Sequence, residues 1–296
     1  MHKKILITGS TGFVGRQLVK KLLQDGHSIL EITRNKEKSF KLFGNATSKV
    51  IVTDVNFENQ ISTFNPNIVI HLAAHLTPND QYEDIKKLID SNILFISKLL
   101  NAVSRLDLDL FINTGTFAEY SNGNDEYSPA YFYSATKTAS RSILNYYSNT
   151  HNFKQCTVVP YTIYGGKSKS KKIIDLILES TESQRKLELT PGDQVLDFIH
   201  IDDVISFYQC LINNVNEISN KSNFKLGTGK GHNLKEVANK VESLTNKKTN
   251  ISWGAKDYRK CDVMYAVADL DEINNQLTWT PKVSIDMGIS KLIQSE

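Results

Sequence analysis

Cysteine is scarce in this sequence, and its distribution argues against a disulfide framework or a zinc site. The 296 residues contain three cysteines, Cys156, Cys210 and Cys261, which lie far apart and show no CxxC spacing. An odd number of scattered cysteines is typical of a protein that works in a reducing compartment. We therefore expect a cytoplasmic protein that holds no metal.

Long apolar runs and an excess of one charge are absent as well. No apolar stretch approaches the roughly 18 residues of a membrane span, and the N-terminal run Ile5-Leu-Ile7 is too short for a signal peptide. The 35 basic and 32 acidic residues are spread along the chain and leave a net charge of +3. This balance argues against a nucleic-acid or membrane surface, so we expect a soluble protein with neither kind of partner.

Short apolar runs alternate with amphipathic stretches through the first two-thirds of the chain. Apolar residues at positions 14, 18, 19, 22 and 23, for example, repeat with the 3.6-residue period of a helix. The expected strands span residues 4–8, 28–33, 49–52, 68–72, 108–113 and 155–159, and the expected helices include 12–24, 88–105 and 134–148. This alternation predicts an α/β protein with a Rossmann-type doubly wound parallel sheet that helices cover on both faces.

The pattern changes after about residue 167, where helices expected at 173–180, 204–213 and 234–244 are separated by more irregular segments. We expect residues 1–166 to form the Rossmann domain. Residues 167–296 are expected to form mainly a smaller mixed α/β lobe, with part of this segment returning to the main sheet.

A glycine-rich turn, Gly9-Ser-Thr-Gly12-Phe-Val-Gly15, follows the first expected strand and opens an amphipathic helix. In such a turn the first glycine allows a tight bend, the second lets the backbone approach a phosphate, and the third permits close packing of helix on strand. The strand before it and the helix after it make this a prediction of a dinucleotide pyrophosphate site.

The end of the second expected strand bears on the choice of cofactor. An acidic residue there would accept hydrogen bonds from the adenosine ribose and repel a 2′-phosphate. Thr33 and Arg34 stand at this place instead, while Glu31 lies too early in the strand, so a guanidinium is available to pair with the phosphate. We predict NADP(H) in preference to NAD(H). Asp54 is expected to meet the adenine amine, and Val55 the adenine face.

The fourth expected strand ends in His71-Leu-Ala-Ala74, whose small residues leave room for the cofactor. His75 follows at once and is placed to touch a substrate. A histidine at a strand end is more often a hydrogen-bonded bystander, so both interpretations stay open for it.

Tyr133 and Lys137 lie four residues apart, which is one helical turn, so the phenol and the ammonium share a face. An ammonium close to a phenol favours the phenolate and lowers the pKa of the tyrosine, which can then pass a proton at neutral pH. Tyr131 is a competing acid, but Ala135 stands where its lysine would be. Beside a dinucleotide, this pair predicts proton transfer coupled to hydride transfer.

Together these motifs resemble those of the extended short-chain dehydrogenase/reductase family, also called the NAD-dependent epimerase/dehydratase family. The resemblance implies an NAD(P)-binding Rossmann domain, a C-terminal lobe that binds a nucleotide-diphosphate sugar, and a homodimer built from two helices of each subunit. The motifs occur in family order over nearly the whole chain: Gly9 to Gly15, Asp54-Val55, Leu72-Ala-Ala74, Ser91-Asn92, Thr114-Gly-Thr116 with Tyr120, Tyr133 with Lys137, Tyr164-Gly165, Asp197-Phe-Ile-His-Ile-Asp-Asp-Val204 and Leu226-Gly-Thr-Gly229.

The resemblance also implies roles for single residues. Tyr133 takes the place of the acid/base, Lys137 that of its partner, which also binds the nicotinamide ribose, and Thr116 that of the residue that hydrogen-bonds the reacting sugar oxygen. The expected cofactor contacts are Gly9, Thr11, Gly12, Phe13, Val14, Gly15, Thr33, Arg34, Asp54, Val55, Leu72, Ala73, Ala74, Asn92, Thr114, Tyr133, Lys137, Pro160 and Thr162, and the expected substrate contacts are His75, Thr116, Phe117, Thr162 and Arg259.

The residues after Thr116 narrow the reaction. Dehydratases of the family carry Asp-Glu there, whereas this chain has Phe117 and Ala118, which cannot exchange protons. A looser resemblance to bacterial 4-ketoreductases such as CDP-abequose synthases, together with Arg34, favours NADPH-dependent reduction of the C4 keto group of a nucleotide-linked 4-keto-6-deoxy or 3,6-dideoxy hexose in deoxysugar or O-antigen precursor biosynthesis. A nucleotide-sugar 4-epimerase with tightly bound NAD and an NADP-binding sensor without turnover remain alternatives.

The sequence departs from the family pattern where relatives contact the nucleotide diphosphate. Leu196 stands in place of an arginine and Thr162 in place of an asparagine, so Arg259 is the cation expected to remain at the diphosphate. Asp202 and Asp203 are adjacent acids, but at the start of a helix we expect them to satisfy amides rather than to form a catalytic pair.

Overall fold

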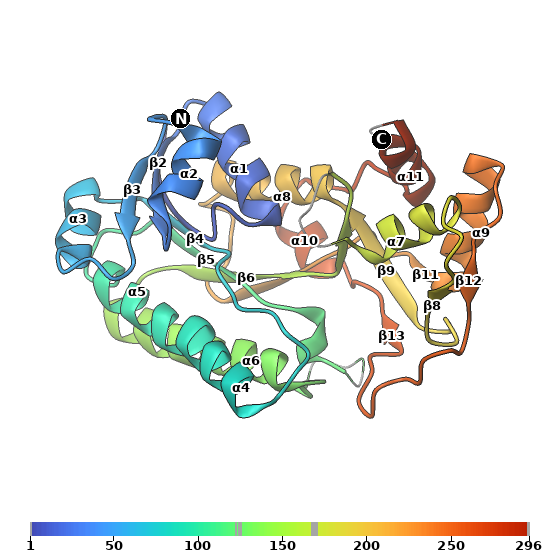
Figure 1. Cartoon of the computed structure of the whole chain (residues 1–296). Helices are drawn as coiled ribbons and strands as arrows, with labels where there is room; N and C mark the ends of the chain where they lie inside the picture. Colours follow the sequence, from blue (N-terminus) through green and yellow to red (C-terminus); the bar gives the residue numbers. More distant parts are fainter. Residues whose placement is uncertain (1, 122, 124–125, 167–170, 295–296) are drawn as a thin grey trace.

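The computed structural model describes residues 2–121, 123, 126–166 and 171–294. Within them, the main sheet consists of seven parallel strands in the order β10-β6-β5-β4-β1-β2-β3 (Figure 1). The strands are β1 (Lys4–Thr8), β2 (Ser28–Thr33), β3 (Ser48–Ile51), β4 (Ile68–His71), β5 (Leu110–Thr114), β6 (Gln155–Pro160) and β10 (Ser222–Leu226). The order reverses between β1 and β4, and such a reversal leaves a crevice for ligands at the carboxyl ends of the strands.

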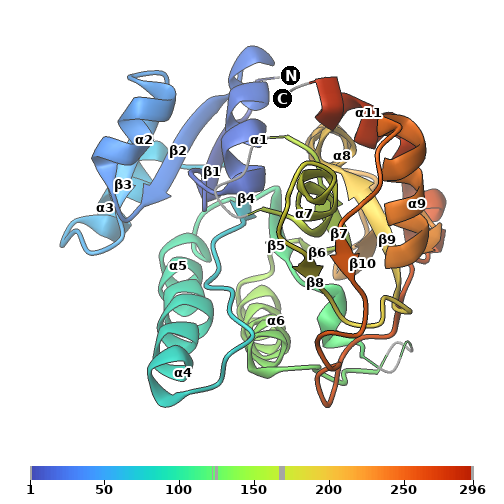
Figure 2. The same cartoon turned by 45° about the vertical axis from the view of Figure 1, so that its right-hand side comes forward.

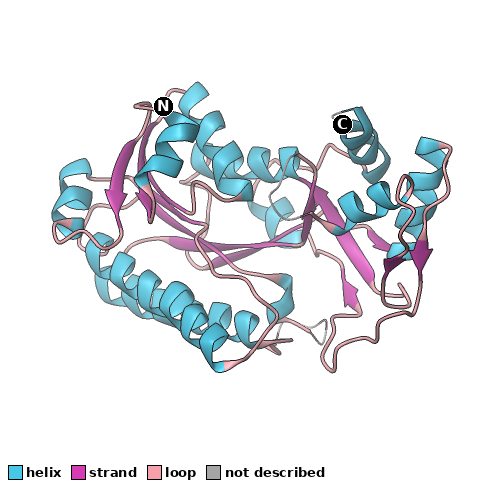
Figure 3. Cartoon of the chain, in the orientation of Figure 1, coloured by secondary structure: helices cyan, strands magenta, loops and turns pink. Residues whose placement is uncertain are grey.

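The predicted doubly wound α/β fold is confirmed, and the first two strands have the predicted bounds. The other four predicted strands overlap the observed ones, with ends that differ by one or two residues. Helices cover both faces of the sheet (Figures 1 and 3). Those around the main sheet are α1 (Phe13–Gln24), α2 (Lys36–Phe43), α3 (Phe57–Phe64), α4 (Tyr82–Ile89), α5 (Phe95–Val103), α6 (Phe132–His151), α8 (Ile201–Asn213) and α10 (Asp271–Gln276).

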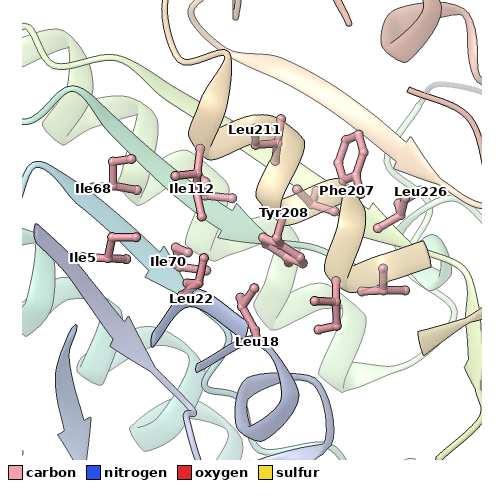
Figure 4. Packing of buried hydrophobic residues seen from close by; sticks show 14 of the residues in the cluster. Ile5, Leu18, Leu22, Ile68, Ile70, Ile112, Phe207, Tyr208, Leu211 and Leu226 are labelled. Atoms are coloured by element: carbon pink, nitrogen blue, oxygen red, sulfur yellow. The ribbon is translucent and has the colours of Figure 1, made fainter. Parts of the chain in front are cut away.

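Side chains of the central strands alternate between two cores, as the two-residue period of a strand requires. Ile5 and Ile7 of β1 join the core under α1, α8 and α10, whereas Leu6 joins the core under α3, α5 and α6. Figure 4 shows the first of these cores, where Leu18 of α1 and Tyr208 of α8 converge above the strands. Because both faces are buried, the central strands β1 (KILIT) and β4 (IVIH) are mainly apolar, which explains why they were recognisable in the sequence, whereas the edge strand β10 (SNFKL) was not predicted.

The predicted helix at 88–105 is only partly correct. The structure begins it at Tyr82 and divides it into α4 and α5 by a π-helical turn, η1, at Asp90–Leu94. A π turn is a single-turn insertion within an otherwise continuous helix, and the apolar residues on both sides of it still read as one helical segment in the sequence.

The chain after residue 166 builds a second core beside the main sheet (Figure 2). β9 (Val195–His200) lies at its centre and pairs with β7 (Thr162–Tyr164), β11 (Gly231–Asn233) and β13 (Tyr265–Ala266). The remaining elements of this lobe are α7 (Ile173–Ser180), β8 (Leu187–Glu188), α9 (Leu234–Thr245), β12 (Ile251–Ser252) and α11 (Ile285–Gln294). Three later elements, α8, β10 and α10, belong to the main sheet and its core, so the chain returns twice from this lobe to the main sheet.

Buried carboxylates hold the irregular segments of this lobe. Asp197 accepts hydrogen bonds from the backbone amides of Thr228, Gly229 and Ala268 at 2.9–3.2 Å. Asp203 accepts from the amides of Lys282 and Val283 at 3.0 and 2.9 Å. The expectation that Asp202 and Asp203 satisfy the amides at the start of their own helix is therefore wrong in its partners: His200 caps α8, and Asp203 accepts from a distant segment.

Among the described residues, no helix combines the length and the apolar character that crossing a bilayer requires. The longest of these helices, α6, is 20 residues long and amphipathic, with buried polar and catalytic candidates on its inner face.

Candidate active site

The glycine turn after β1 has the geometry that a phosphate site needs. Gly9 has a φ of +73°, and a Cβ added to it would lie 2.7 Å from the backbone nitrogen of Ala73. A Cβ on Gly15 would lie 2.2 Å from the carbonyl oxygen of Gly9, so no other residue fits either place. Gly12 is the N-cap of α1 and provides no side-chain cap, which leaves the first amides of the helix available to an anion.

A cavity of about 610 Å³ opens beside this turn, at the carboxyl ends of β1, β2 and β4. Its volume lies in the range of small-molecule and cofactor sites. Ser10 Oγ and His75 Nε2 are buried and lack a hydrogen-bond partner within the described part of the chain, and both residues line the cavity. The lining consists of Gly9, Ser10, Thr11, Gly12, Ile32, Thr33, Arg34, Lys38, Val52, Leu72, Ala73, Ala74, His75, Lys87, Asp90, Ser91 and Phe95.

Eight of the predicted cofactor contacts are among these lining residues: Gly9, Thr11, Gly12, Thr33, Arg34, Leu72, Ala73 and Ala74. Lys38 and Lys87 were missed. Lys38 had a weak signal in the sequence, because it lies in the first turn of the helix that begins two residues after Arg34. Lys87 had none, since its approach to the turn depends on where α4 lies in space.

The end of β2 shows why Glu31 takes no part in the cavity. Its side chain is fully buried and accepts hydrogen bonds from Ser39 Oγ, at 2.8 Å, and from Thr47 Oγ1, while Lys49 Nζ lies 3.8 Å away. The interpretation that this glutamate lies too early in the strand is confirmed. Arg34 remains at the strand end, on the cavity wall.

The segment after β3, where Asp54 and Val55 were expected to contact an adenine, reaches the cavity through a different residue. Val52 lines the cavity, whereas Val55 is 97% exposed and outside the lining. The carboxylate of Asp54 accepts from the backbone amide of Asn56 at 2.8 Å, at the start of α3. Contacts of Asp54 and Val55 with an adenine therefore stay predictions.

Asn92, in the π turn, joins the cavity to the catalytic helix. Its Nδ2 donates to the carbonyl of His75 at 3.1 Å and to Thr136 Oγ1 at 2.9 Å, and its Oδ1 accepts from the His75 amide at 2.8 Å. Thr136 in turn donates to the carbonyl of Tyr133 at 2.6 Å. Asn92 thus fixes the loop after β4 and the first turn of α6 relative to each other. It does this from a buried position and is not part of the cavity lining.

Thr116, Tyr133 and Lys137 are all buried, and they lie on two neighbouring elements, the short turn after β5 and helix α6. Thr116 follows β5 and caps a short 3₁₀ turn, η2 (Phe117–Glu119), while Tyr133 and Lys137 lie in the first two turns of α6. The exposed fractions of the three residues are 9%, 8% and 3%. Their contact with a cofactor stays a prediction, since none of them lines the large cavity.

The electrostatics of the tyrosine contradict the expectation from sequence. Burial raises the pKa of Tyr133 above its ordinary value, and Tyr131 and Glu119 add to the increase. Burial lowers the pKa of Lys137 to about 8, with Glu119 opposing this shift and Arg141 adding to it. The predicted lowering of the tyrosine pKa by Lys137 is therefore wrong for this arrangement: burial of the phenol dominates the shift, and Lys137 is not among the groups that act on it.

His71 lies at the end of β4, close to Lys137. Burial lowers the pKa of His71 to about 3, and Lys137 adds to the shift. The Nδ1 atom of His71 lies 2.9 Å from Thr8 Oγ1, at the end of β1. His71 is therefore neutral and contacts the last residue of β1, directly before the glycine turn.

The residues after Thr116 carry no group for proton exchange with a substrate. Phe117 stacks on Tyr161, with ring centroids 5.6 Å apart and an angle of 23° between the ring planes. Ala118 is 1% exposed and packs in a small cluster with Val263. The side chains in the positions of the dehydratase acids are thus part of the packing between the two bodies.

The second lobe brings a cation close to this group. Tyr131 stacks on Tyr133, with ring centroids 6.0 Å apart. Burial raises the pKa of Tyr131, and Arg259, although exposed, lies near enough to oppose the shift. Arg259 therefore lies near Tyr131, and its contact with a diphosphate stays a prediction.

Three other predicted contacts lie at neighbouring strand ends. Thr114 Oγ1 is 3.1 Å from Tyr208 Oη, so this threonine is engaged with α8. Pro160 ends β6, and Thr162 begins β7, which pairs with β9 of the second lobe. None of the three lines the large cavity, and their roles stay predictions.

Comparison with known proteins agrees with this geometry. The model of the NAD dependent epimerase/dehydratase family matches residues 5–227. The chain therefore belongs to this family, and the resemblance inferred from its motifs is confirmed.

Individual relatives are distant but match over the whole chain. CDP-abequose synthase of Salmonella typhimurium is 25% identical, and the match covers 99% of this chain and 98% of that protein. UDP-glucose 4-epimerase of Mycolicibacterium smegmatis is 22% identical, with 98% and 97% covered. The crystal structure of UDP-glucose 4-epimerase from Thermotoga maritima with UDP-glucose has a TM-score of 0.86 at 20% identity and covers 99% of this chain and 98% of that one, a likeness that concerns the fold.

Proposed function

We propose that this protein reduces the C4 keto group of a nucleotide-linked 4-keto-6-deoxy or 3,6-dideoxy hexose, with NADPH as the reductant. The observation that carries the proposal is the pair of cations, Arg34 and Lys38, on the cavity wall beyond β2. Two cations suit a 2′-phosphate, and the carboxylate that would repel it, Glu31, is buried elsewhere. NADPH is the cofactor suited to net reduction, and similarity to CDP-abequose synthases supports the same class of product.

The residues present fit the cofactor. The glycine turn and the uncapped start of α1 would hold the pyrophosphate, and the buried Oγ of Ser10 offers an unpaired group beside it. Ala73 and Ala74, small residues after β4, leave space along the cavity. A bound NADPH supplies the hydride that adds to C4.

The catalytic residues then protonate and stabilise the carbonyl oxygen. As the hydride adds to C4, the electron pair of the C=O bond moves to the oxygen, and Tyr133 transfers its phenolic proton to that oxygen to give the alcohol. Thr116 hydrogen-bonds the same oxygen and steadies the developing charge. Lys137, positively charged at neutral pH, stabilises the phenolate left on Tyr133 until solvent returns a proton.

Reduction is favoured over the 4-epimerase alternative by the two cations that suit NADPH, and the direction of the Tyr133 pKa shift agrees with this choice. A reductase needs the tyrosine protonated when the reaction starts, which a high pKa ensures. An epimerase begins by oxidising its substrate, for which the tyrosine must first accept a proton. Similarity to UDP-glucose 4-epimerases keeps this activity as the second candidate. A sensor without turnover is disfavoured because both Tyr133 and Lys137 are present.

Oxidation of NADPH in the presence of CDP-, dTDP- and GDP-linked 4-keto-6-deoxyhexoses tests the proposal. We expect turnover with at least one of them, and a loss of about 10²–10⁴-fold in Tyr133→Phe, the usual contribution of a general acid. Tyr131→Phe, which alters the stacked neighbour, is the matched control and should retain most activity. Epimerisation of a UDP-sugar without reduction of any keto-sugar would show that the protein is an epimerase instead.

A further inference from the structure

The acid that ends the short turn after Thr116 is buried inside the protein. Glu119 is 0% exposed, and its carboxylate accepts hydrogen bonds from Arg141 Nε at 2.7 Å and Arg141 Nη2 at 3.1 Å. Its Oε1 also accepts from the backbone amide of Thr116 at 2.7 Å. In dehydratases of the family the two acids stand at the positions of Phe117 and Ala118. Glu119 comes one residue later, and its side chain points into the protein interior.

Arg141 extends the contact to two other elements. It lies on α6 one turn after Lys137 and two turns after Tyr133, and is 6% exposed. Its Nη1 donates to Asn223 Oδ1 of β10 at 2.8 Å, and Asn223 Nδ2 donates to Tyr120 Oη at 3.1 Å. One network therefore joins the loop that carries Thr116, the helix that carries the other two catalytic residues, and the edge of the main sheet.

The backbone around the pair is built to admit it. A Cβ on Gly115 would lie 2.4 Å from Arg141 Nη2 and 2.7 Å from Glu119 Oε1, so only glycine leaves room for this approach. A buried ion pair is weak evidence of a gain in stability, because desolvation of both charges offsets their attraction. Glu119 contacts the backbone of Thr116 and acts electrostatically on Tyr133 and Lys137 of α6. These interactions indicate a role in placing the site residues rather than in stability.

We propose that Glu119, held by Arg141, is a positioning residue that fixes the backbone of Thr116 against helix α6. The proposal rests on the proposed function in so far as Thr116, Tyr133 and Lys137 act on the substrate. Glu119 opposes the effect of burial on the Lys137 pKa, whereas Arg141 acts in the opposite sense. Because Glu119 contacts no substrate in this arrangement, its loss should lower kcat and leave KM nearly unchanged.

Nuclear magnetic resonance tests the proposal without any substrate. In Glu119→Gln, we expect the Thr116 amide resonance to move and the titration midpoint of Lys137, assigned by its absence in Lys137→Met, to fall by about one pH unit. In Arg141→Met, the midpoint should rise. A general disturbance of packing would not move the midpoint in opposite directions. Unchanged Thr116 and Lys137 signals in both variants would overturn the proposal, whatever reaction the enzyme catalyses.

Kinetics provide the second readout once a keto-sugar substrate is in hand. We expect Glu119→Gln to lower kcat about 10–100-fold with KM within about threefold of wild type. The double variant Glu119→Leu/Arg141→Met should keep the melting temperature of wild type, yet remain slow. Asp202→Asn, which breaks the exposed 2.7 Å pair with Lys291, is the control and should have full activity. Full kcat in the double variant would mean that the Glu119–Arg141 pair is only structural. Absence of turnover in wild type would refute the proposed reduction instead. In that case the magnetic resonance test alone decides the role of Glu119.

Discussion

At the scale of single residues, Lys137 is a buried charge whose proposed role in the reaction is expected to lower the stability of the fold. The side chain is 3% exposed, and burial lowers its pKa from 10.5 to about 8. At neutral pH the ammonium is charged in both folded and unfolded chains, so the folded state bears the cost of its burial. A shift of this size corresponds to roughly 3 kcal/mol.

We therefore expect Lys137→Met to be more stable than wild type at pH 7, by up to about 3 kcal/mol in the free energy of unfolding. Between pH 8 and 10.5 the folded wild type releases the proton before the unfolded chain does, so its stability should rise and the difference should shrink. Urea unfolding at pH 7 and at pH 10 measures both effects. Lys20→Met, at an exposed position on α1, controls for the loss of one positive charge. A variant less stable than wild type at pH 7 would contradict this account.

The cations at the end of β2 are the second case at this scale. We expect Arg34→Ala and Lys38→Ala each to weaken NADP⁺ binding about tenfold, because each removes a charge-assisted contact with the 2′-phosphate, and to leave NAD⁺ binding nearly unchanged. Titration of intrinsic fluorescence measures both constants. Lys36→Ala, on the same helix but outside the cavity lining, is the matched control. Equal losses for the two cofactors would argue against a 2′-phosphate site.

At the scale of elements, β1, its turn and α1 form the unit on which the cofactor site depends. This unit was predictable, because the apolar period of the helix and the spacing of the glycines are local properties. The π turn between α4 and α5 was not. It exists to bury Asn92 between the His75 loop and α6, and these partners are 17 and 44 residues away in the chain.

The unit leads to a direct test. Gly15→Ala places a methyl group 2.2 Å from the carbonyl of Gly9, so α1 must move away from the turn. We expect a loss of about 1–3 kcal/mol in stability, as overpacking usually causes, and loss of measurable NADP⁺ binding. Gly26→Ala is the control: its φ is +83° but no atom lies within 4 Å of the added carbon, so it should cost some stability and leave cofactor binding intact. Normal binding by Gly15→Ala, measured by calorimetry, would show that the turn tolerates a side chain.

At the scale of the whole molecule, we propose that the layer formed by α4, α5 and α6 carries the homodimer expected for the family. The helices lie together on one side of the sheet (Figures 1 and 2), and Leu94 and Tyr146 on this layer are 62% and 63% exposed. Exposed large apolar side chains on adjoining helices suit a subunit contact.

Light scattering after size exclusion tests this proposal. We expect wild type to be a dimer and Leu94→Lys/Tyr146→Lys to be a monomer, because two charges cannot be buried in a symmetric apolar contact. Leu244→Lys, at a 38% exposed leucine of α9 in the second lobe, should remain dimeric. A monomeric wild type would refute the dimer, and a dimeric double variant would place the interface elsewhere.

What the sequence determined by itself was the fold class, the glycine turn, the three residues proposed for catalysis and the absence of acids directly after Thr116. These follow from periodicity and from short spacings, which are set by local geometry. Only the tertiary structure decided how buried these groups are. Tyr133 acquires a raised pKa where proximity to Lys137 alone suggested a lowered one, because desolvation depends on every segment packed around the phenol. The partnership of Glu119 and Arg141, 22 residues apart, likewise exists only once η2 and α6 lie against each other.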